Sequence, residues 1–140
     1  MRVATLTVLF DTLEPMLTRP DLLLRLEALL VLVASLSDYY ALHGRWWLFA
    51  VLFLVPDISL AGYMVKGNER FAAGFYNVIH TYTGPLVMGL VAWEWHSVTT
   101  GQVAAIWLAH IGFDRVLGFG LKYPQAFKPT HIQNVRLFRG

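Results

Sequence analysis

Residues Val103 to Leu121, with the sequence VAAIWLAHIGFDRVLGFGL, combine the length of a transmembrane helix with ionisable side chains in its second half. A helix needs about 20 mostly apolar residues to cross the hydrocarbon core of a bilayer. A charged group at the centre of such a helix costs about 2.5 to 3.5 kcal/mol on insertion, so it rarely faces lipid. We therefore expect a membrane helix that turns His110 and Asp114 toward the interior of a bundle.

Three more apolar stretches precede this one, at about residues 22–42, 46–65 and 71–93. Of the 140 residues, 56% are hydrophobic and 14% are charged, and the mean hydropathy is +0.52. This composition is typical of a membrane chain, and the length leaves room for about four spans. Short connections between the stretches favour antiparallel neighbours. The sequence thus predicts one all-α domain over residues 1–140, an integral membrane four-helix bundle with a short interfacial N-terminus and a basic C-terminal tail.

The basic residues outside these stretches lie almost entirely on one side of the predicted membrane. Lys and Arg near the ends of spans are retained on the cytoplasmic side. The other side carries only Arg45, and the basic side carries Arg2, Arg19, Lys66, Arg70, Lys122, Lys128, Arg136 and Arg139. We therefore expect a multi-pass protein of the inner (plasma) membrane, surrounded by the lipid bilayer, with both termini in the cytoplasm.

Two features of the composition narrow the chemistry. The chain contains no cysteine, which excludes disulfides and thiolate metal sites, so any metal would be held by His and carboxylate groups. The net charge of +2 is small, and the basic residues follow no nucleic-acid-binding pattern. We expect no nucleic acid partner.

The ionisable residues inside the apolar stretches are predicted to share one membrane depth. At a rise of about 1.5 Å per residue they fall in the cytoplasmic halves of their helices, whereas the outer halves are almost entirely apolar. These residues are Glu27, Asp57, His80, His110, Asp114 and Arg115. Because ionisable groups at such a depth usually serve a function, the pattern predicts a site there.

Helical spacing places some of these residues on a common face. His110 and Asp114 are four residues apart, so they align on one side of a helix. Such a pair can present an imidazole and a carboxylate to one metal ion, or it can join a base to its orienting acid. Asn77 and His80 share a face of the third stretch in the same way. A hydrogen-bonded polar cluster that holds the helices together is the alternative interpretation.

This inventory suits a metal centre that contacts a ligand. Two histidines with carboxylates are typical of a divalent metal site, with zinc as the first choice. We assign the metal ligands to His80, His110 and Asp114, the activation of a bound water to Asp57 or Glu27, and contacts to a ligand or cofactor to Asn77 and Arg115.

Pro56 directly precedes Asp57 in the second stretch. Proline lacks a backbone donor and tends to kink a helix. A kink beside an acid can frame a cavity, and the alternative is that Asp57 only pairs with Arg115 or Arg25. Under either interpretation Asp57 should not face lipid.

Three motif blocks cover most of the chain between Leu22 and His131. They are PDxSxxGY from Pro56, YNxxHTY from Tyr76, and HxGxDRxxGxGLKYP from His110. In these blocks the chain resembles a family of small bacterial four-span integral membrane proteins of unknown function. The resemblance implies a fold and a set of marked positions, but no activity.

Three functions stay open at this point. The first is an intramembrane metal-dependent hydrolase that acts on a lipid or an amphiphile. The second is a non-enzymatic membrane module or accessory subunit, in a homo-oligomer or a larger membrane complex, whose polar cluster is structural or binds a small lipid-like ligand. The third is proton or ion conduction along the buried acids and histidines, for which four short helices offer no obvious pathway unless the protein oligomerises.

Overall fold

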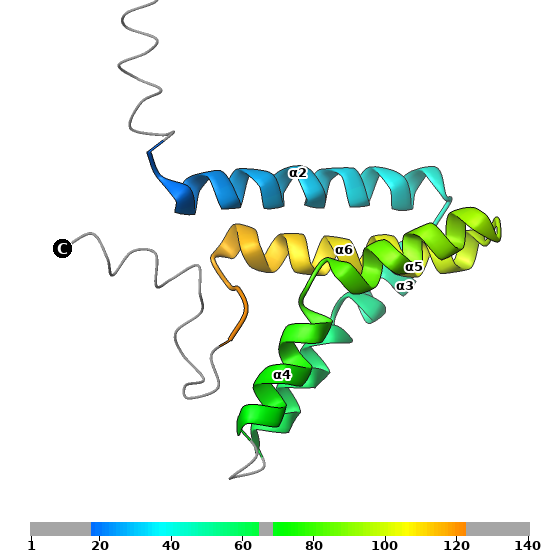
Figure 1. The fold of residues 1–140 in the computed structure, drawn as a ribbon. Coiled ribbons are helices and arrows are strands. Elements are labelled where there is room, and N and C mark those ends of the chain that lie inside the picture. Colours follow the sequence, from blue (N-terminus) through cyan, green and yellow to red (C-terminus); the bar gives the residue numbers. More distant parts are fainter. Residues whose placement is uncertain (1–17, 65–68, 123–140) are drawn as a thin grey trace, which may run out of the picture.

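The computed structural model describes residues 18–64 and 69–122, and these residues form helices and no strand (Figure 1). The helices are α2 (Pro20–Ala41), α3 (Trp46–Phe53), the 3-10 helix η1 (Pro56–Met64), α4 (Glu69–Ile79), α5 (Thr83–Glu94) and α6 (Val98–Leu117). The predicted all-α class is therefore confirmed for this part of the chain.

The two long helices, α2 and α6, run side by side in opposite directions (Figure 1). Pro20 and Asp21 occupy the first turn of α2, where a missing N–H is harmless and a carboxylate meets the positive end of the helix dipole. Gly112 is the point of closest approach. A Cβ atom added there would lie 3.1 Å from the carbonyl oxygen of Ala28 and 3.1 Å from the backbone nitrogen of Leu32. A larger residue at Gly112 would push the two helices apart.

A small aromatic core joins α2, α3 and α6. Tyr39 is fully buried, and its ring lies 5.1 Å from that of Phe49 in an edge-to-face arrangement. Its hydroxyl donates a hydrogen bond of 2.8 Å to the carbonyl of Arg45, so the polar end of the ring is satisfied. Ala105 and Ile106 of α6 complete this core. The short α3 is thereby fixed against the two long helices.

The second and third apolar stretches are each divided, which corrects the expectation of two continuous helices. The second ends as an α-helix at Phe53 and continues as η1 from Pro56. Proline at this position cannot donate the next helical hydrogen bond, and the chain tightens into 3-10 geometry instead. The kink expected at Pro56 is therefore a full break. In Figure 1, η1 lies beside α4, and both point away from the long pair.

The third stretch breaks at residues 80–82, between α4 and α5. The carbonyls freed at this break are bound by side chains. Trp107 donates from Nε1 to the carbonyl of Ile79 at 2.7 Å, and Thr81 donates from Oγ1 to that of Val78 at 3.0 Å. Gly84 makes room for the indole, because a Cβ atom there would lie 2.7 Å from the ring of Trp107. The break is thus held by α6 and not by the local sequence alone.

Gly118 ends α6 in the left-handed conformation, with φ of 91°. Its position as the residue after the last helical turn is typical of glycine, and Phe119 donates to the carbonyl of Asp114 at 2.8 Å. Arg25 of α2 donates from Nη1 to the carbonyl of Val116 at 3.0 Å. The guanidinium of Arg25 therefore stabilises the end of α6.

Within residues 18–64 and 69–122, none of the helices combines the length and the hydropathy that crossing a membrane requires. The placement of the bundle in a membrane and its orientation stay predictions.

Replacing Gly112 by leucine should destabilise the bundle, because the side chain would meet the backbone of α2. Overpacking of this kind costs about 1 to 3 kcal/mol. Gly74 is the matched control, since a Cβ atom there meets nothing within 4 Å. In thermal unfolding followed by circular dichroism, Gly112→Leu should melt well below the native protein, whereas Gly74→Leu should not. Equal melting temperatures for the two variants would contradict the close approach of α2 and α6.

Candidate metal centre

Four potential metal ligands converge where α6 meets the two broken stretches. Asp57 is the second residue of η1, and His80 directly follows α4. His110 and Asp114 are one turn apart on α6, as their spacing predicts. One ligand atom from each residue lies within 4.8 Å of the other three. The two helix breaks are what bring Asp57 and His80 to α6.

The distances among these atoms are short and similar. The two imidazoles face each other through their Nε2 atoms at 3.3 Å. His110 Nε2 lies 3.6 Å from Asp57 Oδ1 and 3.6 Å from Asp114 Oδ2. His80 Nε2 lies 3.8 Å from Asp57 Oδ1 and 3.7 Å from Asp114 Oδ2. Ligands about 2.0 to 2.2 Å from a tetrahedral zinc ion would be about 3.3 to 3.6 Å apart, so the spacing is close to that of a zinc site.

The ring of His80 is oriented by its own helix. Its Nδ1 lies 3.0 Å from the carbonyl of Tyr76, one turn earlier. Because a carbonyl oxygen only accepts hydrogen bonds, the neutral imidazole donates from Nδ1–H here, and Nε2 carries the free lone pair that faces the cluster. The ring of Tyr76 stacks on that of His80 at a centroid distance of 3.8 Å. A backbone carbonyl holding the other ring nitrogen is the usual support of a metal-binding histidine.

Burial differs sharply between the four residues. His80 and His110 are 3% and 1% exposed, and the Asp114 side chain is 17% exposed. The Asp57 side chain is 43% exposed, so the cluster meets its surroundings at Asp57. Phe53 packs edge-on against His110 at 5.2 Å and covers the imidazole on the α3 side. His110 Nδ1 has no hydrogen-bond partner among the described residues.

Two cationic side chains surround the cluster. Arg115 places Nη2 at 3.5 Å from the carbonyl of His80 and lies over the ring of Tyr82, 4.5 Å from its centroid. The Nζ atom of Lys122 lies over the ring of Tyr76, 4.6 Å from its centroid. Burial lowers the pKa of the Lys122 ammonium, and the nearby carboxylates oppose this shift. Together these cations partly balance the negative charge of the site.

Asn77 holds the chain that follows α6. Its Nδ2 donates to the carbonyl of Lys122 at 2.9 Å, and its Oδ1 accepts from the backbone nitrogen of Lys122 at 2.7 Å. The amide is thus committed to the backbone. The prediction that Asn77 contacts a ligand or cofactor is not tested by this arrangement, but these two bonds would have to break for its amide to turn to a ligand.

Glu27 lies apart from the four-residue cluster. It is exposed on α2, and the candidate set that converges contains no residue of α2. Asp57, by contrast, lies as close to the imidazoles as Asp114 does. Of the two acids proposed to activate a water, Asp57 is therefore the one that the fold brings to the site.

Tyr76 contributes to the site by stacking on His80, but the sequence pattern did not identify it as a site residue. It precedes His80 by four residues, so helical spacing predicts contact between the two rings, and the signal was available. Lys122 gave no such signal, because it follows the end of α6 and reaches the site only through the fold.

The fold and the site define an all-α bundle with a mostly buried His/Asp cluster that could hold a metal ion. The chain belongs to the family described as "Domain of unknown function (DUF4260)", whose match covers residues 21–135. The match includes all four residues of the cluster. No curated protein and no solved structure matches the chain. The expectation of a family without an assigned activity is thereby confirmed.

The purified protein should contain close to one divalent metal ion per chain. His80→Ala, His110→Ala and Asp114→Ala should each lose most of it, because each removes a ligand atom of the cluster. His96→Ala is the matched control, since His96 is exposed and lies after α5, away from the cluster. Elemental analysis of the folded variants measures this. Metal contents that do not differ between His110→Ala and His96→Ala would contradict a metal centre at this cluster.

Proposed function

We propose that this protein is a membrane-embedded metal-dependent hydrolase that acts on a lipid or an amphiphile. The observation that carries the proposal is the convergence of Asp57, His80, His110 and Asp114, whose ligand atoms lie within 4.8 Å of one another. The proposed activity follows from the chemistry of these four side chains and from the exposure of Asp57.

The cluster needs a cation or a shared proton among its ligand atoms, and a divalent cation suits all four of them. The Nε2 lone pair of His80 and the two carboxylates all face His110 Nε2. If His110 also carries its proton on Nδ1, two lone pairs and two anionic oxygens meet without a proton between them, which is strongly unfavourable in a buried site. A single hydrogen bond from His110 Nε2 to His80 at 3.3 Å would leave the two carboxylates balanced only in part, by the nearby Lys122 ammonium. A divalent ion between the four atoms satisfies all of them.

Zinc is the first candidate for this ion. Imidazole nitrogen and carboxylate oxygen are both common zinc ligands, and two carboxylates neutralise the charge of a divalent cation. The separations of 3.3 to 3.8 Å are close to the edges of a tetrahedron around zinc. Manganese and ferrous iron accept the same ligands, so the metal has to be identified by measurement.

Asp57 is the residue that makes hydrolysis the favoured reaction. It is the most exposed of the four, and it lies on a 3-10 segment instead of a long helix. His80, His110 and Asp114 would hold a divalent metal ion, which when bound would supply the acidification of a water. Asp57, the most exposed acid of the cluster, would accept the proton of that water as the general base.

Embedding in a membrane is supported by the surface of the bundle. Large apolar side chains are exposed on several helices, among them Leu30 at 71%, Val78 at 69% and Leu90 at 70%. Water-soluble monomers rarely expose large apolar patches, so the many large apolar side chains on the outside of the helices favour contact with lipid. A lipid surrounding covers these residues without a further protein. We propose the inner membrane with both termini in the cytoplasm, on the distribution of basic residues.

Hydrolysis should depend on the metal and on Asp57 in separable ways. The metal-loaded protein in detergent should cleave at least one class of long-chain fluorogenic ester, amide or phosphoester, and a chelator should abolish cleavage until zinc is added back. Asp57→Asn should keep much of the metal but lower kcat by about 10²- to 10⁴-fold, the usual contribution of a general base. Cleavage that survives complete metal removal, or that Asp57→Asn leaves unchanged, would contradict this mechanism.

A structural metal is the second candidate, favoured by the fact that four protein ligands fill a tetrahedral site. Closed four-ligand zinc sites usually stabilise a fold and do not catalyse. In that case the chain is a non-enzymatic membrane module. Metal removal would then lower the melting temperature strongly, and no substrate class would be cleaved by the loaded protein.

Membrane embedding can be tested without the metal. The native protein should sediment with membranes and resist extraction by alkaline carbonate, while a neutral detergent should release it, because exposed apolar side chains hold it in lipid. Recovery of a folded monomer in buffer without detergent would contradict the proposed location.

A further inference from the structure

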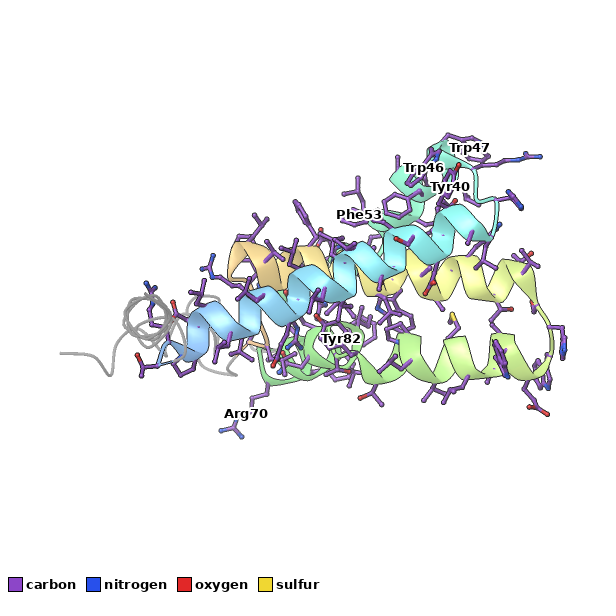
Figure 2. All side chains as sticks on the ribbon, turned by 90° about the horizontal axis from the view of Figure 1, so that it is seen from above. Tyr40, Trp46, Trp47, Phe53, Arg70 and Tyr82 are labelled. Carbon is purple, nitrogen blue, oxygen red and sulfur yellow. The ribbon has the colours of Figure 1, made fainter. Side chains whose placement is uncertain are left out.

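A groove of about 600 Å³ lies over the N-terminal half of α6, between α2 and α5. Its floor consists of residues at helical spacing on one face of α6, namely Gly101, Ala104, Ala105 and Leu108. Figure 2 shows α2 and α5 diverging toward the end of the bundle that carries Trp46 and Trp47, with α6 visible between them. The groove shares no residue with the metal cluster.

The groove is open because the residues that line it are small. Several alanine and glycine residues line the groove where the helices face one another. They are Ala41, Gly89, Ala92, Gly101, Ala104 and Ala105. A Cβ atom added at Gly89 would meet nothing within 4 Å, so no side chain of residues 18–64 or 69–122 fills that space. Its volume is within the range of binding pockets for small ligands, about 300 to 1,000 Å³.

One end of the groove is polar and carries the negative charge of a carboxylate. Asp38 of α2 is exposed there and makes no ion pair with any residue in 18–64 or 69–122. His96 lies opposite with Nδ1 at 3.1 Å from the carbonyl of Glu94. Ser97 is committed as the N-cap of α6, where its Oγ accepts from the nitrogen of Thr100. The Asp38 carboxylate is thus a charged group at this end that no described residue neutralises.

We infer that this groove binds the hydrocarbon chain of an amphiphile whose head group carries a positive charge. The charged head lies at Asp38, and the chain runs along the floor of α6 toward Leu108. The floor from Gly101 to Leu108 covers about 10 Å of helix at 1.5 Å per residue, which matches an extended chain of roughly eight methylenes. Burial of these methylenes makes the chain the source of affinity, and Asp38 is the source of selectivity.

The surroundings of the polar end suit an amphiphile better than a protein partner. Trp46, Trp47, Trp93 and Trp95 are all more than half exposed, and they open α3 or lie at the end of α5. Tryptophan rings at one end of a bundle are typical of the membrane interface, where lipid head groups lie. The head group at Asp38 and the chain below it would then be aligned with the bilayer. The start of α2 and the end of α6 lie at the opposite end of the bundle.

Photolabelling with two matched probes tests the inference. The probes are alkyl chains carrying a diazirine, one with a trimethylammonium head and one with a sulfonate head. They are applied to the full chain in dodecyl maltoside. The ammonium probe should label peptides that contain residues 89–93 and 101–108 several-fold more than the sulfonate probe does. Gly89→Leu should abolish this labelling by filling the groove, and Gly74→Leu, which adds the same side chain on α4, should keep it.

Asp38→Asn provides the second variant, because it keeps the shape of the side chain and leaves the groove open. It should reduce the preference for the ammonium probe by about two- to fivefold, which corresponds to the loss of one exposed ion pair. Equal labelling by the two probes, labelling spread evenly over the exposed apolar face of α2, or labelling unaffected by Gly89→Leu would overturn the inference. Contacts between two copies that disappear in Gly89→Leu would overturn it too, in favour of a dimer. None of these outcomes depends on the metal.

Discussion

Two imidazoles and two carboxylates meet within 4.8 Å of one another, and the arrangement of the other segments follows from this encounter. Lone pairs and anionic oxygens at such distances repel in a mostly buried site unless a cation or a proton lies among them. The groups come from three segments, and in this fold they meet where the second and third apolar stretches are broken. These are the break before Pro56 and the break after Ile79.

Each break leaves backbone groups that must be satisfied, and the site is built from the groups that satisfy them. Trp107 of α6 binds the carbonyl of Ile79 and so fixes the end of α4 where His80 follows. Asn77 binds both backbone groups of Lys122 and holds the chain after α6 beside the same helix. Hydrogen bonds from side chains to the backbone thus replace helical hydrogen bonds that are missing at the breaks. They also help to orient the candidate metal ligands.

Helix α6 presents two separate faces to its neighbours. One face presents His110 and Asp114 to η1 and α4, and another forms the floor of the groove between α2 and α5. Gly112 lets α6 lie directly against the backbone of α2, which sets how the helix is rotated between its neighbours. The proposed metal chemistry and the inferred binding of an amphiphile can therefore be lost independently, because no residue contributes to both.

Helix α2 matches its predicted stretch to within two residues, whereas α6 begins five residues and ends four residues earlier than predicted. The amino-acid pattern alone predicted these two helices, the shared face of His110 and Asp114, and a kink at Pro56, because each depends on neighbours within about one turn. It did not predict the break after Ile79, since an unbroken apolar run does not distinguish one helix from two and the freed carbonyl is bound by the distant Trp107. Nor could it separate Asp57 from Glu27. Both acids were expected at the same depth, but depth follows from position along a helix, whereas the direction a side chain faces follows from how helices are rotated against each other. Packing against α6 leaves Glu27 exposed and, through the break at Pro56, brings Asp57 to the histidines.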